Sequence, residues 1–335
     1  MVHFLLLAVC AVAIYLSCEW FVNAVEWLGR RLNVGRMAVG TILAAFGTAL
    51  PESVVTLVAV TSGGDARHKD IGVGAAMGGP LALATVAYGV TGAMLYFRRR
   101  KAAASAPVLE SDSELRRLAK DQTWFLPIFV VKVALGLVAF AFKPALGVVF
   151  LAAYAVYFWR EMRGGADDDE AQEELEPLKL QPRAESPATW AVAAQTLATL
   201  AVIFFASQLF VRQLDAVGPM LGLSATVTAL LLSPIATELP EIMNAIIWVR
   251  QGKTDLALAN ISGAMMIQAT VPSALGLLFT PWHFDGALLW SGVITTAAIA
   301  YLLTTLRAGR LTPARLAGSA GLYGVFAAGL AAILA

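Results

Sequence analysis

Three glutamates lie within long apolar stretches of the chain, where a charged side chain is costly to place. Glu52 directly follows Pro51. Glu241 likewise follows Pro240, and Glu238 precedes that proline by two residues. A carboxylate inside a membrane-spanning helix costs at least a few kcal/mol, so it marks an ion pathway or a binding site. We therefore expect these carboxylates to bind a cation; the alternative is a structural carboxylate that is protonated or bonded to a neighbouring helix.

The residues around the two Pro-Glu pairs add further oxygen ligands. Proline removes a backbone N–H donor and frees carbonyl oxygens in the preceding turn. A helix opened in this way is tolerated in a membrane where it lines a cavity or is covered by protein. Thr48 stands one turn before Glu52, and Thr237 one turn before Glu241. Hard cations such as Ca²⁺ and Na⁺ prefer oxygen ligands of these kinds, so two such sets facing each other could surround one divalent ion.

The composition places these glutamates in a membrane protein. Of the 335 residues, 59% are hydrophobic and 14% are charged, whereas a soluble domain has about a quarter charged residues. At about 20 residues per crossing, the apolar residues suffice for roughly ten spanning helices. This excludes a soluble enzyme and a disordered chain. The net charge of +1 gives no reason to expect a nucleic-acid partner.

Apolar runs predict an all-α polytopic membrane protein with ten transmembrane helices. The expected spans are approximately 3–28, 36–62, 71–97, 124–142, 144–159, 189–211, 222–249, 255–280, 286–305 and 312–334. The first run ends in Arg30 and Arg31 rather than a small-residue cleavage site, so it is expected to stay as a span and not to be a signal peptide.

Lysine and arginine gather in alternate connections between the spans. The exceptions are Arg67, Lys69, Lys143, Arg212 and the intramembrane Lys132. Because basic residues favour the cytoplasmic side, we expect both termini outside and the large loops, including 98–122, in the cytoplasm. The expected location is the inner cell membrane, with the lipid bilayer as the partner and no obligate protein partner.

The two halves of the chain are copies of one unit. A shift of 189 residues overlays Phe21 on Phe210, Val22 on Val211, Glu26 on Asp215, Gly29 on Gly218, Thr48 on Thr237, and Leu50-Pro51-Glu52 on Leu239-Pro240-Glu241. Further along, a shift of 185 overlays Asp70 on Asp255 and Gly78 on Gly263. Five helices per copy is an odd number, so the second copy must be inverted, which is a transporter architecture. The alternative is an old duplication without transport function.

The expected domains follow from this duplication. The first inverted repeat covers 1–159 and the second covers 189–335. The acidic segment 160–188 between them is expected to be a cytoplasmic linker rather than a calcium sensor, because it lacks the ligand spacing of a calcium loop.

Gly47-Thr48-Ala49-Leu50-Pro51-Glu52 resembles the first repeat signature of the sodium/calcium exchanger (cation/Ca²⁺ antiporter) superfamily, which is usually Gly-Thr-Ser-x-Pro-Glu. Residues 237–241 resemble the second copy, so the chain looks like a divergent prokaryotic member. The resemblance implies that the Thr and Glu of each copy bind the ions, with backbone carbonyls three residues before each Thr. The corresponding residues here are Thr48, Glu52, Thr237 and Glu241, with the carbonyls of Ala45 and Pro234.

The helix after each signature departs from the family pattern, which is Gly-Asn-x-x-Gly-Ser-Asn-x-x-Asn/Asp. In the first copy the Ser position is Gly79 and the Asn/Asp position is Leu83, so both side-chain ligands are absent. In the second copy these positions are Ala264 and Gln268, of which Gln268 remains a candidate ligand.

Glu238 stands where the family has the serine beside the second Thr. The site therefore holds one carboxylate from the first copy and two from the second. Two carboxylates within a few ångströms share one proton over a wide pH range, so Glu238 is a candidate ligand that carries a coupling proton. The alternative is that Glu238 points toward another helix. Asn244 follows Glu241 on the same helical face and is expected to support it.

Lys132 lies midway along the expected span 124–142, too deep to reach water comfortably. Structural pairing with Glu19 or Glu26 is one expectation. The other is that its ammonium replaces a monovalent coupling ion.

The sequence therefore predicts a secondary antiporter, not an enzyme, with no cofactor. The most direct reading is exchange of Ca²⁺ against Na⁺ by alternating access at a central site formed by Glu52 and Glu241. One alternative is an H⁺-coupled exchanger of Ca²⁺, Mg²⁺ or Mn²⁺. The alternative of another class is a non-transporting membrane scaffold or sensor that keeps the exchanger fold, which the missing ligands at Gly79, Leu83 and Ala264 would favour.

Overall fold

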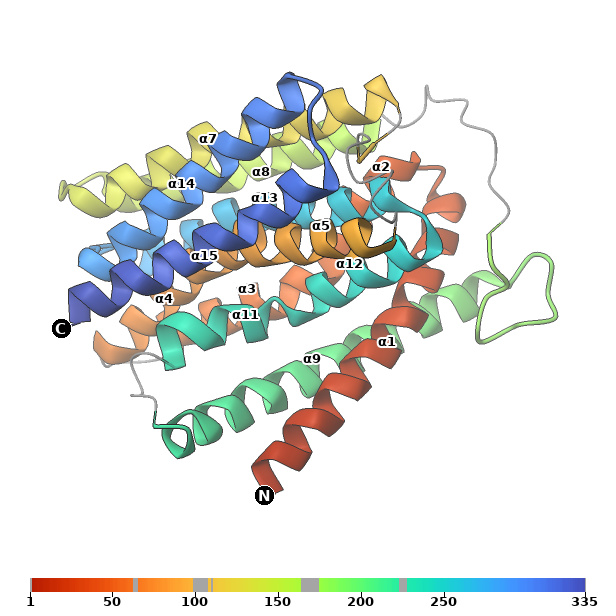
Figure 1. Ribbon diagram of the computed structural model, residues 1–335, viewed down its shortest axis with the longest axis horizontal. Coiled ribbons are helices and arrows are strands. Elements are labelled where there is room, and N and C mark those ends of the chain that lie inside the picture. The colour runs from red at the N-terminus through yellow and green to blue at the C-terminus, as the bar shows by residue number, and fades with distance from the viewer. Residues whose placement is uncertain are drawn as a thin grey trace.

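The computed structural model describes residues 2–62, 66–98, 108–109, 111–163, 175–222 and 228–334, and every regular element in these ranges is a helix (Figure 1). The first half contains α1 (Val2–Leu32), α2 (Arg36–Ala38), η1 (Val39–Ala44), α3 (Ala45–Ser62), α4 (Ala66–Ala82), η2 (Leu83–Ala87), α5 (Tyr88–Arg98), α7 (Asp112–Leu137), η3 (Lys143–Ala145) and α8 (Leu146–Arg163). The second half contains α9 (Thr189–Met220), η4 (Thr228–Leu232), α11 (Ser233–Thr237), α12 (Leu239–Gln251), α13 (Thr254–Phe279), α14 (Gly286–Arg307) and α15 (Pro313–Leu334).

Several of these elements follow one another without a loop, so the described ranges form ten helical stretches that correspond to the ten predicted spans. Seven are long and apolar enough to cross a membrane, or eight if the bent pair α11–α12 is counted as one span. The other two are the stretch that ends in α3 and the amphipathic α7. The predicted class, an all-α polytopic membrane protein built from two inverted five-helix repeats, is confirmed.

The fourth helix begins earlier and ends earlier than the sequence predicts. Residues 112–122, which the sequence places in the loop 98–122, form the first turns of α7, and Ser111 caps this helix by accepting a hydrogen bond from the Ser113 N–H at 3.2 Å. The helix then ends at Leu137 instead of 142. Beyond it, Lys143 Nζ binds the carbonyls of Val138, Pro281 and Trp282, which holds a non-helical connection in place.

Two π-helical segments mark the repeat in the structure. Under the shift of 189 residues that overlays the sequences, η1 (Val39–Ala44) corresponds to residues 228–233, and these residues include η4 (Thr228–Leu232). A π turn widens the helix and leaves backbone groups poorly paired, and it often marks a functional site. Each of the two stretches then runs into a Thr-x-x-Pro-Glu motif. The long helices α1 and α9 also occupy corresponding positions in the two repeats under this shift.

The helix α13 forms the centre of the bundle and is buried along almost its whole length. It contacts α3, η1, α4, α7, α8 and α12. Glycines permit close approach between the two repeats: Gly263 on α13 lies against the Thr41 carbonyl of η1. The repeat-related Gly78 on α4 lies so close to α11 that an added Cβ would be 2.7 Å from Pro234 Cγ. Each repeat therefore inserts its glycine-bearing helix against the Pro-Glu helix of the other.

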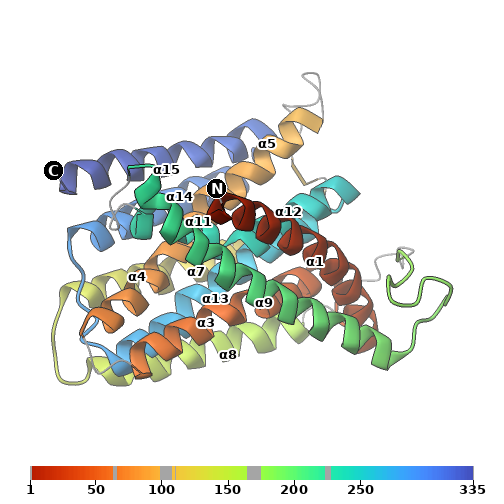
Figure 2. The same ribbon diagram turned by 90° about the horizontal axis from the view of Figure 1, so that it is seen from below.

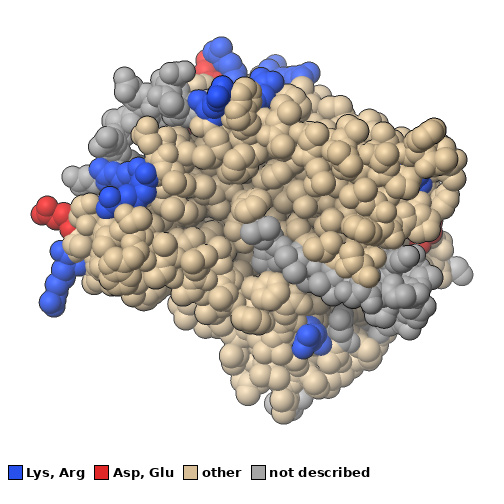
Figure 3. Space-filling view, turned by 180° about the vertical axis from the view of Figure 1, so that it is seen from behind, with Lys and Arg blue, Asp and Glu red and all other residues tan. Residues whose placement is uncertain are grey.

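The helices α1 and α9 lie side by side at the periphery, away from α7 and α14 (Figures 1 and 2). The described part of the linker, 175–188, lies at the opposite end of the molecule from the C-terminus (Figure 1). One face of the molecule is almost free of charged side chains, and lysine and arginine gather toward one end of it (Figure 3). Large apolar residues are exposed on α1, α8 and α9. An exposed apolar surface of this extent is typical of a lipid-facing protein.

Candidate functional site

The second Pro-Glu motif lies at a break in its helix. The helices α11 and α12 meet at Glu238 with a bend of 51°. The Pro234 carbonyl accepts hydrogen bonds from the Thr237 hydroxyl at 3.1 Å and from the Glu238 N–H at 3.2 Å. Because the Thr237 hydroxyl uses its proton on this carbonyl, its lone pairs face elsewhere and can bind a cation. The Pro234 carbonyl itself is already engaged by two donors.

Glu238 turns toward the centre of the bundle. Its side chain is fully buried, and the Gln268 side-chain N–H donates to both of its carboxylate oxygens at 2.7 Å. Gln268 belongs to α13, so this contact joins the helix break to the central helix. The two residues that replace the family's serine and Asn/Asp in the second repeat are thus direct partners.

Gly79 faces this pair from α4. A Cβ added at Gly79 would lie 2.8 Å from Glu238 Oε1 and would also clash with the Gln268 side chain. Because the space is filled by Glu238 and Gln268, a serine at position 79 cannot be accommodated without displacing them. Three departures from the family pattern, at positions 79, 238 and 268, therefore belong to one local rearrangement.

Glu241 lies one turn further along α12 and is 1% exposed. The Asn260 side-chain N–H approaches the Glu241 backbone carbonyl at 3.5 Å. Within the described ranges, neither side-chain polar atom of the fully buried Asn244 has a hydrogen-bond partner, and the Asn260 side-chain oxygen has none. Buried polar atoms are normally satisfied, and exceptions call for a water, an ion or a functional role. These amides supply oxygens beside Glu241.

The first repeat contributes Thr48, which is 4% exposed and donates its hydroxyl proton to the Ala44 carbonyl at 3.2 Å. Ala45 is fully buried. The hydroxyl of the buried Thr56, one turn beyond position 52, has no hydrogen-bond partner among the described residues. The side chain of Glu52 lies outside the described residues, although its backbone belongs to α3, which contacts both α12 and α13. The expected pairing of Glu52 with Glu241 stays a prediction.

Lys132 does not pair with Glu26. The Glu26 carboxylate accepts hydrogen bonds from Trp248 Nε1 at 2.8 Å and from Lys253 Nζ at 2.5 Å, which ties α1 to the end of α12. Lys132 is fully buried, and its Nζ donates to the carbonyls of Ala76 at 2.7 Å and Gln268 at 3.4 Å. Its ammonium therefore lies between α4 and α13, beside the Glu238–Gln268 pair.

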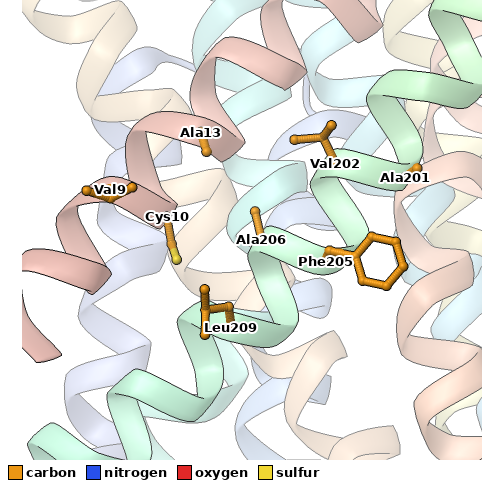
Figure 4. A pocket seen from close by; sticks show the side chains of 8 residues that line it. All are labelled: Val9, Cys10, Ala13, Ala201, Val202, Phe205, Ala206 and Leu209. Atoms are coloured by element: carbon orange, nitrogen blue, oxygen red, sulfur yellow. The ribbon is translucent and has the colours of Figure 1, made fainter.

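One apolar pocket lies between α1 and α9, with a volume of about 380 Å³ (Figure 4). It is lined by Val9, Cys10, Ala13, Ala201, Val202, Phe205, Ala206 and Leu209. None of the predicted ion ligands lines it, and its lining offers no oxygen ligand, so it is not the cation site.

The described residues contain no cluster of three or more His, Cys, Asp or Glu side chains that could hold a metal ion. A cation among them would be bound by carboxylates together with amide, hydroxyl and backbone oxygens, which suits Ca²⁺ or Na⁺ rather than Zn²⁺.

A second buried polar cluster was not predicted. Gln122 Nε2 donates to the Tyr88 hydroxyl at 2.9 Å and to Ser262 Oγ at 3.0 Å, and Ser262 Oγ lies 3.3 Å from the Asp121 carboxylate. The Asp121-Gln122 pair directly before an apolar run was the available sequence signal. The cluster joins α5, α7 and α13.

Comparisons with known proteins agree with this architecture. The profile of the family described as "Sodium/calcium exchanger protein" matches residues 2–162 and 191–331. CaxA of Alkalimonas amylolytica, provisionally named as an antiporter, is 26% identical over 305 residues, covering 88% of this chain and 87% of that protein. Inner membrane protein YrbG of Escherichia coli K12 is 25% identical over 289 residues, covering 84% and 81%.

Among solved structures, the sodium-calcium exchanger NCX_Mj soaked with Na⁺ and Ca²⁺ superimposes with a TM-score of 0.76 at 18% identity, over 98% of this chain and 99% of that one. At this identity the likeness concerns the fold. Because the family profile matches most of both halves, the chain belongs to the sodium/calcium exchanger protein family. It is a multi-pass membrane antiporter for cations, of a family of transporters rather than enzymes.

Proposed function

We propose that this antiporter exchanges Ca²⁺ against Na⁺ at a single central site. The proposed ligands are the side chains of Thr48, Glu52, Thr237, Glu238, Glu241 and Gln268, with the carbonyl of Ala45. The Pro234 carbonyl would join them after it releases one of the two donors that it binds here. The observation that carries the proposal is the pair of buried carboxylates, Glu238 and Glu241, at the helix break. They stand beside Asn244, whose buried amide has no hydrogen-bond partner among the described residues. This site lies at the meeting point of the two repeats, where inverted-repeat transporters bind their ions.

Exchange follows from competition for the same oxygens. A divalent ion and the monovalent ions that replace it cannot occupy one set of carboxylates together, so binding of one releases the other. Alternating access then requires a part of the protein that moves around a fixed site. The α1–α9 pair suits this role, because α1 contacts η1 and α12 while α9 contacts α3 and α11.

Proton coupling is the second candidate, and the Glu238–Gln268 contact favours it. A proton on one carboxylate oxygen of Glu238 competes with the Gln268 amide for that oxygen. Protonation would therefore loosen a contact between α13 and the helix break. In this case H⁺ would take the place of Na⁺, with Ca²⁺, Mg²⁺ or Mn²⁺ as the counter-ion.

The proposed orientation places the protein in the inner cell membrane. Both termini would be outside, and the linker 160–188 between the proposed repeat units 1–159 and 189–335 would be cytoplasmic. Protease accessibility of a tag at each terminus in right-side-out and inverted vesicles tests this arrangement. Cleavage only in inverted vesicles would contradict it.

The direct test of function is labelled Ca²⁺ counterflow in proteoliposomes, with imposed Na⁺ and pH gradients applied in turn. Acceleration by the Na⁺ gradient alone supports the first proposal, and acceleration by the pH gradient alone supports proton coupling. No gradient-dependent flux of any divalent cation would contradict both and leave a non-transporting scaffold. Glu185→Gln, at an exposed linker position, is the matched control for carboxylate substitutions.

A further inference from the structure

Two prolines in the central helices each free one carbonyl oxygen, and one side chain binds both. Pro80 lies inside α4 and Pro272 lies inside α13. Proline has no backbone N–H, so the carbonyls four residues earlier, those of Ala76 and Gln268, lose their helical hydrogen bonds. Lys132 Nζ donates to these two carbonyls, at 2.7 Å and 3.4 Å, and the Gln268 carbonyl also accepts a hydrogen bond from the Ser273 hydroxyl at 3.4 Å.

The surroundings of the Lys132 ammonium are those of a small monovalent cation. Besides the two carbonyls, the face of the Phe129 ring lies 5.1 Å from Nζ. Backbone carbonyls replace the hydration shell of monovalent cations in membrane proteins, and aromatic faces attract cations. The Lys132 side chain is fully buried. Two proline-freed carbonyls and an aromatic ring thus contribute to the buried position that its charge occupies.

This position adjoins the proposed ion site through shared residues. Gln268 offers its backbone carbonyl to Lys132 and its side-chain amide to Glu238. Ala76 lies one turn before Gly79, which faces both Gln268 and Glu238. A cation at the Lys132 position therefore belongs to the same electrostatic unit as the transported ions.

We propose that the Lys132 ammonium is a tethered monovalent cation that permanently occupies one ion position of the exchanger. The chain then moves one monovalent ion fewer per divalent ion than it would with that position open to solution ions. The stoichiometric part rests on the proposed function, whereas the occupancy of a cation position by Lys132 does not.

The occupancy is tested without transport, on purified protein in detergent. Lys132→Ala removes the ammonium and leaves the two proline-freed carbonyls, so methylammonium, Na⁺ or K⁺ should raise the melting temperature of this variant saturably. The comparison salt is N-methylglucamine chloride at equal ionic strength, because that cation is too large to enter. Lys132→Met, which fills the same space without a charge, should show no additional stabilisation over the unsubstituted protein.

The stoichiometry is tested in proteoliposomes held at zero membrane potential, with an imposed Na⁺ gradient of about tenfold. One additional Na⁺ per cycle multiplies the equilibrium Ca²⁺ ratio by about tenfold, or about 1.4 kcal/mol. Lys132→Ala should therefore reach a ratio about tenfold higher than the unsubstituted protein. An unchanged ratio would overturn the stoichiometric claim.

The outcomes separate the two proposals. If the unsubstituted protein moves no Ca²⁺ but Lys132→Ala responds to small cations in the melting assay, the proposed function fails and the cation position stands. If Lys132→Ala melts identically in all salts, the tethered-cation proposal fails whatever the transport result. Lys132→Ser serves the same comparison if the alanine variant does not accumulate. The proposal would also be overturned if neither Lys132→Ala nor Lys132→Ser folds in methylammonium while Lys132→Met does. In that case the position requires the aliphatic part of the lysine side chain and not a cation.

Discussion

The Gln268 amide binds both carboxylate oxygens of Glu238 at 2.7 Å and so joins the central helix to the break between α11 and α12. In the sequence these two residues are separate departures from a family pattern. In the structure they form one contact, and Gly79 leaves the room for it. Positions 238 and 268, where the family resemblance implies a serine and an Asn or Asp ligand, thus hold a hydrogen-bonded pair beside Lys132.

Removal of the Glu238 charge should alter the pH dependence of transport. In Glu238→Gln, a neutral amide faces Gln268 and the group that is proposed to exchange a proton is gone. We expect Ca²⁺ uptake to lose its dependence on pH and its rate to fall by roughly tenfold, about 1.4 kcal/mol. The measurement is initial uptake across a pH series, with Glu185→Gln as the control. Uptake of Glu238→Gln that follows the pH profile of the unsubstituted protein would refute the role.

A methyl group at position 79 should disturb the same pair. The Cβ of Gly79→Ala would lie 2.8 Å from Glu238 Oε1, so the pair must shift. Overpacking of this kind lowers the free energy of unfolding by about 1–3 kcal/mol. Gly74→Ala on the same helix is the matched control, because no atom of the described residues lies within 4 Å of its added Cβ. Equal melting temperatures for the two variants would show that the Glu238–Gln268 geometry is not restrictive.

The carboxylates of the two Pro-Glu motifs should both be required for flux. Glu52→Ala and Glu241→Ala each remove one proposed ligand of the central site, so each should abolish gradient-driven Ca²⁺ flux in proteoliposomes. Membrane insertion, measured as the yield of monodisperse protein, should be unchanged. Retained flux in both variants would eliminate this site.

Asn244 should contribute to ion binding at the expense of stability. Its amide is fully buried and, in the ranges that the structure describes, makes no hydrogen bond. An apolar residue of similar shape removes the desolvation cost of about 1–3 kcal/mol, so Asn244→Leu should melt at the same or a higher temperature. The apparent Ca²⁺ affinity should fall. A higher melting temperature of Asn244→Leu with an unchanged Ca²⁺ affinity would show that the Asn244 amide does not take part in ion binding.

The ion pair that ties α1 to α12 should stabilise the observed arrangement. Glu26 and Lys253 are 8% and 12% exposed, and their charged atoms are 2.5 Å apart. Glu26→Gln keeps an acceptor for Trp248 but removes the negative charge. We expect the free energy of unfolding to fall by about 1–3 kcal/mol. Glu176→Gln is the control, because its pair with Lys179 is longer, at 3.8 Å, and more exposed, so it should cost less than about 1 kcal/mol. Similar melting temperatures would show that α1 is held by apolar packing.

The sequence by itself determined the class of the protein. Apolar runs of the length of a bilayer must become helices, since the membrane interior offers no other partner for backbone groups. The internal shift of 189 residues predicted the inverted duplication, and η1 and η4 lie at corresponding positions under this shift. The Pro-Glu motifs marked the positions at which a charge is kept inside the membrane.

Only the tertiary structure decided which of these residues meet. In the sequence, Gly79 stands where the family pattern has a serine. In the folded chain, the side chains of Glu238 and Gln268 fill the space that a side chain at position 79 would need. Lys132 binds carbonyls that two prolines distant in sequence leave without a helical donor. Glu26, one of the two glutamates that the sequence suggested as its partner, binds Lys253 instead. Periodicity and composition give the faces of helices, but contacts between helices far apart in sequence depend on how closely their backbones approach, and that is set by packing of the whole bundle.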